Sequence, residues 1–256
     1  MTQDQGKKAS LPDVGILLQQ TVDEYGKNIG PYALAGVGHL LYSLPVVLIA
    51  IVALYITLFV GIFGTAIASA GLVAALPRDL AGMGAVLGGV GSMGVFFLIL
   101  FLFVGVINML MAPVNASLMR AIVKHQRGEE PLSIGSAFST ATQDLVPVLG
   151  SALILSILAA FLSLFCLIPA LLVPLLFSFT FGLVALHRKG AIESMKQSAD
   201  HARQNLGWHA FYVFLHWGLS MVANNVPVLG PTFMAALSVR ATEALYGDAI
   251  LETSDP

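Results

Sequence analysis

Long apolar runs alternate with short polar segments along this chain. Acidic and basic residues are absent from four stretches: Asn28 to Pro77, Leu80 to Met119, Leu145 to His187 and Gln204 to Val239. A helix needs about 20 apolar residues to cross about 30 Å of hydrocarbon, and each stretch exceeds that length. The pattern therefore predicts an all-α protein, a polytopic bundle of transmembrane helices.

Amphipathic segments precede the apolar runs, and we call them the leading segments. The first runs from Gly15 to Gly30 and the third from Glu193 to Gly207. In register they pair Gln20 with Gln197, Thr21 with Ser198, Asp23 with Asp200, and Asn28 with Asn205. The second, Ser133 to Pro147, matches more loosely, with Asp144 in the place of Asn28. We expect these segments to form short interfacial helices that lie flat at the headgroups.

This similarity suggests internal repeats, although the sequence alone leaves true repetition open. The predicted organisation is one transmembrane domain over residues 15–247, with repeats at 15–128, 131–189 and 190–247. Polar tails flank it at 1–14 and 248–256, and we expect both to be flexible. The first apolar run starts too late and is too long for a cleaved signal peptide, so it is expected to act as an uncleaved anchor.

Each repeat is expected to hold one helical hairpin whose returning helix begins near a proline, at Pro113, Pro174 and Pro231. Turn-forming residues place the second and third hairpin turns at Cys166–Pro169 and Asn224–Pro227.

In the first repeat a span starts near Leu34, and a glycine-rich connection from Gly71 to Gly94 forms a re-entrant or surface loop. A return helix then runs from about Val95 to Val123. The total is six spans as three hairpins.

Basic residues orient the bundle, because Lys and Arg near spans stay on the cytoplasmic side. With six spans, eleven of the twelve basic residues lie on one side and only Arg78 on the other. We therefore expect a multi-pass protein of the bacterial inner (plasma) membrane with both termini cytoplasmic. Splitting residues 29–76 and 80–119 into two spans each gives eight helices and satisfies the same rule, so charge counting leaves both arrangements open.

Composition supports a membrane location. The chain has 256 residues, of which 57% are hydrophobic and 10% charged, against about 25% charged in soluble domains. Its net charge of −2 and scattered basic residues provide no electropositive face for nucleic acid. The expected partners are the lipid bilayer, other membrane proteins or further copies of this chain. The single cysteine, Cys166, excludes an internal disulfide.

Five polar residues inside the apolar runs are candidates for a cavity or permeation path, because polar groups in hydrocarbon are costly and often functional. They are His39, Asn108, Asn115, His209 and His216. The alternative is a structural role, as hydrogen bonds between helices or as anchors at headgroup depth beside Trp208 and Trp217. The spacing predicts no metal site, and we expect neither a cofactor nor a catalytic residue.

Charged residues near the span ends have simple expected roles. Arg240 and Glu243 are three residues apart and are expected to pair on one helix face. Arg120 and Lys124 are expected to mark the cytoplasmic end of the second span and to extend towards the headgroups.

Two sequence segments, Ser194-Met195-Lys196-Gln197-Ser198 and Asn205-Leu206-Gly207-Trp208, carry a resemblance to known proteins. Here the chain resembles uncharacterised bacterial six-helix membrane proteins and the membrane domain of bacterial glycerophosphoryl diester phosphodiesterases. In those phosphodiesterases the catalytic barrel is a separate domain, and this chain has no polar stretch long enough to form it. The resemblance thus implies a membrane fold and carries over no activity or site residue.

Two hypotheses of function follow. The first is a non-enzymatic membrane scaffold or accessory subunit of a membrane complex, consistent with apolar runs that lack charged residues. The second is a transporter or channel for a small solute or lipid, in which the repeats move and the five candidates line a cavity. An intramembrane enzyme has little support, since no nucleophile and base are placed to meet.

Overall fold

The structure is a computed structural model that describes residues 11–75, 77, 81–163, 167–223 and 225–250. Within these ranges the chain is helical, which confirms the all-α prediction. The elements are α1 (Val14–Lys27), α2 (Ile29–Ala75), α3 (Ala81–Gln126), the 3₁₀ helix η1 (Ile134–Ala137), α4 (Leu145–Ser163), α5 (Leu167–Phe177), α6 (Thr180–His187), α7 (Ala191–Gln204), α8 (Leu206–Ala223) and α9 (Leu229–Tyr246).

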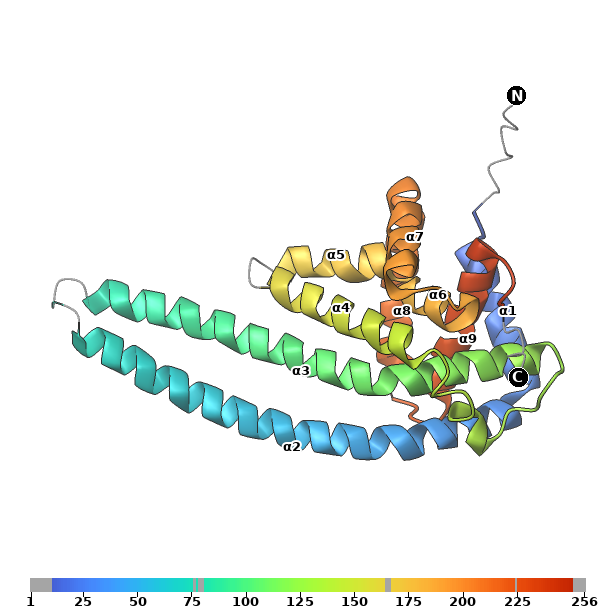
Figure 1. The fold of residues 1–256 in the computed structure, drawn as a ribbon, viewed down its shortest axis with the longest axis horizontal. Coiled ribbons are helices and arrows are strands. Elements are labelled where there is room, and N and C mark those ends of the chain that lie inside the picture. The colour runs from blue at the N-terminus through green and yellow to red at the C-terminus, as the bar shows by residue number, and fades with distance from the viewer. Residues whose placement is uncertain (1–10, 76, 78–80, 164–166, 224, 251–256) are drawn as a thin grey trace, which may run out of the picture.

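Helices α2 and α3 form a long hairpin that extends from the rest of the molecule, and α4 and α5 form a shorter hairpin along α3 (Figure 1). The prediction of a loop from Gly71 to Gly94 is wrong: α2 continues to Ala75, and the α3 backbone is helical from Ala81 onwards. A continuous helix bonds the backbone N–H and C=O groups within itself, and this outweighs the low helix propensity of glycine.

The first hairpin is far longer than one membrane crossing. At 1.5 Å per residue, the 47 residues of α2 extend about 70 Å, against about 30 Å of hydrocarbon. Pro113, expected to start the returning helix, instead lies inside α3, as Pro45 does inside α2. No turn within either described helix marks a point at which it divides into two spans.

The other two hairpins agree better with the expected turns. Helix α5 begins at Leu167, so residues 167–169, expected in the turn, are helical and Pro169 is in the first helical turn. Pro174, expected to start this helix, lies in its interior. Cys166 is outside the described residues. Residues 225–228 are the described part of the connection from α8 to α9, and Pro231 is in the first turn of α9, as predicted.

Three helical segments of the described chain are long and apolar enough to cross a membrane: Ile29–Gly61, Phe103–Gln126 and Leu145–Leu162. Leu171–His187 is a shorter apolar segment. In the first of these, only 6% of the most apolar 18-residue stretch is buried inside the protein.

Two of the leading segments are helices of equal length and similar ending. Helices α1 and α7 have 14 residues each, and they stop at Asn28 and Asn205. Each asparagine side chain donates to the carbonyl oxygen four residues earlier, at 3.2 Å for Glu24 and 3.3 Å for His201. The second leading segment differs, because it forms η1 and turns rather than an α-helix. Duplication of the unit stays a prediction.

The main apolar core lies where the carboxyl-terminal parts of α3, α6 and α9 meet. Buried side chains there include Ile122 and Val123 of α3, Leu186 of α6, and Ala236 and Val239 of α9. The ends of all three returning helices are thereby held together, and the polar network described next surrounds this junction.

Candidate functional site

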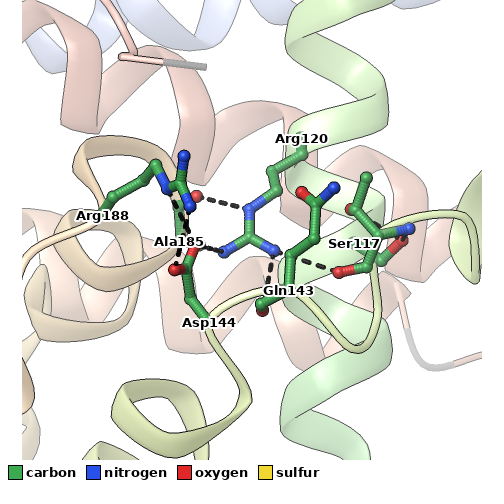
Figure 2. A network of polar contacts seen from close by, with 7 residues as sticks. Ser117, Arg120, Gln143, Asp144, Ala185 and Arg188 are labelled. Carbon is green, nitrogen blue, oxygen red and sulfur yellow. Dashed lines mark hydrogen bonds and ion pairs between the residues drawn. The ribbon is translucent and has the colours of Figure 1, made fainter. Parts of the chain in front are cut away.

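A buried arginine joins several segments at the junction of the hairpins. Arg120 of α3 is 3% exposed. Its Nε donates to the Ala185 carbonyl at 2.8 Å, and its Nη1 donates to the carbonyls of Thr140 (3.1 Å) and Gln143 (3.2 Å). Its Nη2 donates to Oδ2 of Asp144 at 3.1 Å, as Figure 2 shows. Four of the five guanidinium N–H groups are therefore used within the protein.

Asp144 connects this arginine to a second one. The Arg188 side chain donates to both carboxylate oxygens of Asp144, from Nε at 3.1 Å and from Nη2 at 3.3 Å. Both residues have left-handed backbones, with φ of 52° and 51°. Asp144 immediately precedes α4 and Arg188 immediately follows α6, so one carboxylate ties the start of one helix to the end of another.

The network continues through hydroxyl groups to η1. Ser117 donates to the Ser136 carbonyl at 3.1 Å, and its own Oγ accepts from the Thr140 backbone N–H at 3.1 Å. Ser117 is fully buried. Since buried polar groups are costly without partners, these bonds fix the turn-rich segment between α3 and α4 onto α3. The arrangement is a structural cross-link between α3 and this segment.

Two expectations about charged residues are wrong. Arg120 does not extend towards headgroups, because its partners lie inside the protein. Arg240 pairs with Glu24 of α1, and Glu243 lies 3.8 Å from Arg127 of α3. The reason is that α9 packs against α1 and α3, so partners distant in sequence replace the neighbour on the same helix.

The structure brings two of the five candidate residues together. His39 of α2 and Asn115 of α3 are 2.9 Å apart, from Nε2 to Oδ1. His39 is buried, and its Nδ1 has no hydrogen-bond partner in the described part of the protein. Asn108 is exposed and lies two helical turns before Asn115.

The remaining two candidates have other partners. His209 of α8 is fully buried, with Nε2 2.7 Å from Nδ1 of His201 on α7. His216 contacts Ser238 of α9, at 3.2 Å from Nε2 to Oγ. Only His39 and Asn115 of the five candidates are therefore in contact, and none of the five lines the surface cleft between α7 and α9 or the one between α1, α3 and α9.

Sequence reasoning missed His201, Asp144 and the burial of Arg120. Burial lowers the pKa of His201 below its ordinary value, which favours the neutral imidazole. One signal was available for Asp144: it occupies the position of Asn28 in the repeat register, where the helix direction changes.

An aromatic cluster packs beside the histidine pair. The ring centroid of Phe179 lies 5.9 Å from that of Trp208, 5.3 Å from that of His209 and 4.9 Å from that of Tyr212. The Trp208 indole donates to the Pro12 carbonyl at 2.7 Å. Trp208 therefore fixes the segment before α1 and is more than an interfacial anchor.

Among the described residues, no group of three or more His, Cys, Asp or Glu side chains is placed to hold a metal ion. Comparison with protein-family models finds no match, and comparisons with curated proteins and with solved structures likewise find none. The resemblance drawn from the leading segments stays a prediction.

Proposed function

We propose that this chain is a non-enzymatic integral membrane protein that acts as a scaffold or accessory subunit of a membrane complex. The observation that carries the proposal is the apolar, uncovered surface of α2. Side chains such as Ile49, Tyr55 and Phe59 are 70%, 72% and 65% exposed. An apolar face this long needs lipid or another protein to cover it.

Rigid ionic connections at the base of the hairpins also support a scaffold. Arg120, Asp144 and Arg188 link α3, α4 and α6, and Glu24 with Arg240 links α1 to α9. A base held by such pairs keeps the projecting hairpins in fixed relative positions. That property suits a protein that presents a surface to partners.

We further propose a multi-pass arrangement in the bacterial inner membrane, with α2/α3, α4/α5–α6 and α8/α9 as three crossing hairpins and both termini cytoplasmic. Basic residues gather at the hairpin bases, in agreement with the rule for cytoplasmic loops. Because α2 is about 70 Å long, it must tilt strongly or extend beyond the hydrocarbon. Contact with a partner protein would cover the part that lipid does not.

Site-specific photocrosslinking in native membranes tests the scaffold role. A photoreactive residue at Tyr55 or Phe59 is expected to give one discrete protein adduct. The matched control is Ala50, which is on the same helix but only 6% exposed and should give none. Adducts with lipid alone at both exposed positions would contradict the scaffold proposal.

The second candidate function, a transporter or channel, is favoured by one observation, the buried and half-satisfied His39 in contact with Asn115. It predicts solute flux in vesicles that contain only this protein, with flux lost in His39→Ala and Asn115→Ala. Asn108→Ala is the control, because Asn108 is exposed. Flux unchanged in all three variants would exclude this pair from any permeation path.

A further inference from the structure

A surface cleft of about 650 Å³ lies between α1, α3 and α9. Every side chain that lines it is polar, and the lining residues are Gln20, Asp23, Glu24, Lys27, Asn28, His125, Gln126 and Arg240. A lining of polar side chains favours a small polar group over a hydrocarbon chain as its occupant.

Part of the lining is already fixed by internal bonds. Glu24 pairs with Arg240, and it also accepts from the Gln126 amide at 3.1 Å and the Tyr32 hydroxyl at 2.8 Å. The Nε of Arg240 is buried and has no hydrogen-bond partner in the described part of the protein. Internal bonds therefore hold this side of the cleft in place, and the side chains still available lie on α1.

Two charged side chains on α1 remain available. Asp23 and Lys27 are exposed, and neither has a hydrogen bond or ion pair within the described residues. They are four residues apart, so they share one helix face with Cβ atoms about 5–6 Å apart. With histidine neutral, the two acidic and two basic residues of the cleft balance. A simple anion or cation gains little there, whereas a zwitterion meets a partner for each of its charges.

The cleft is also at the boundary between polar and apolar parts of the protein. Helix α1 leads directly into the apolar segment Ile29–Gly61, and the apolar segment Phe103–Gln126 ends at the cleft. In a bilayer this level corresponds to the headgroups.

We propose that the cleft binds a zwitterionic phosphate ester of a primary amine, the chemistry of an aminoethyl phosphate headgroup. The ammonium group contacts the Asp23 carboxylate, and the phosphate contacts the Lys27 ammonium. A primary ammonium donates three hydrogen bonds, which a quaternary ammonium cannot. The inference rests on the proposed membrane insertion and is independent of the scaffold role.

Lipid titration of the purified full-length protein in detergent, read by native mass spectrometry, tests this. The probes are dioleoyl phosphatidylethanolamine, phosphatidylglycerol, which lacks the amine, and phosphatidylcholine, which lacks amine N–H groups. We expect the ethanolamine lipid to bind about fivefold more tightly than the other two, since one exposed charge contact contributes up to about that factor.

Substitutions assign the contacts. Asp23→Asn should lower the affinity for the ethanolamine lipid to that for phosphatidylglycerol, and Lys27→Gln should weaken both lipids about threefold to fivefold. The matched controls are Glu129→Gln and Arg203→Gln, exposed charges outside the cleft that should change neither affinity. Equal affinity for the three lipids, or an unchanged preference in both cleft variants, would overturn the proposal.

Free O-phosphoethanolamine distinguishes the two sources of this chemistry. If millimolar O-phosphoethanolamine displaces the lipid, the site recognises the aminoethyl phosphate group itself, whether that group is free or part of a lipid. A lipid preference that persists without displacement assigns it to the intact lipid. Both results support zwitterion recognition, and neither depends on the photocrosslinking result, so failure of one proposal leaves the other testable.

Discussion

Arg120 and Asp144 form an ion pair of 3.1 Å in which the guanidinium is 3% exposed and the carboxylate 19% exposed. Because Asp144 also holds Arg188, replacing this carboxylate leaves two cations without their shared partner. We predict that Asp144→Asn lowers the free energy of unfolding by about 3 kcal/mol, as expected for breaking a largely buried pair. Thermal unfolding in detergent, followed by loss of the monodisperse peak, measures it.

The control uses an exposed pair of the same kind. Glu130→Gln removes the partner of Lys124, whose ion pair has side chains 27% and 60% exposed, and it should cost less than about 1 kcal/mol. Asp144→Ala should be worse than Asp144→Asn, because asparagine tolerates the φ of 52° better than alanine. Equal stability of Asp144→Asn and Glu130→Gln would show that the network does not hold the junction.

Close backbone approach gives a second prediction. A Cβ added at Gly36 of α2 would overlap the carbonyl oxygen of Val228, which lies in the turn before α9. Gly36→Ala should therefore destabilise the protein by about 1–3 kcal/mol through forced backbone shifts. The control, Gly64→Ala on the same helix, has nothing within 4 Å of the added carbon and should be neutral or slightly stabilising. The same unfolding assay compares the two variants. A loss of stability in Gly36→Ala that is smaller than that in Gly64→Ala would argue against this packing.

Sequence reasoning recovered the helical class, the turn before Pro231 and two of the three leading helices, since each follows from local chemistry. Uncharged runs predict apolar helices, and Asn28 and Asn205 end helices through bonds to carbonyls four residues back. Sequence reasoning failed where the surroundings of a segment determine its secondary structure. The glycine-rich stretch after Ala81 is helical, and Pro113 is accommodated inside α3.

The polar site was less predictable for a similar reason. His39 and Asn115 were both candidates, yet only the hairpin register shows that they touch. Arg120 has its backbone acceptors at Ala185, Thr140 and Gln143, and no residue type marks a carbonyl that will accept from a distant arginine. Tertiary hydrogen bonds to backbone therefore leave no trace in the sequence.

Acidification should weaken the contact between α7 and α8. Burial lowers the pKa of His201, so the unfolded chain takes up a proton more readily than the folded protein as pH falls through about 6.5. The stability contributed by neutral His201 is thus complete above that pH and is lost below it, down to the lowered pKa. We expect the Tm to be level above about pH 7 and to fall towards pH 5.

The variant His201→Asn should make this fall shallower, because it removes one of the groups that must stay neutral. Asn108→Ala is the control: it replaces an exposed residue that does not titrate and should leave the pH dependence as it is. Melting curves at half-unit steps from pH 5 to pH 8 decide the matter. If the dependence of Tm on pH is the same in His201→Asn as in the unsubstituted protein, His201 does not contribute to the loss of stability in acid.

Charge on the exposed face of α2 distinguishes lipid from water as its surroundings. Ile49 is 70% exposed near the middle of the segment Ile29–Gly61. In hydrocarbon, Ile49→Asp should cost about 2.5–3.5 kcal/mol and reduce the fraction of protein retained in membranes after an alkaline carbonate wash. Ile49→Phe, which stays apolar, should be retained fully. On a surface facing water the aspartate would be harmless or improve solubility, so full retention or a monodisperse detergent-free form of Ile49→Asp would mean that α2 does not face lipid.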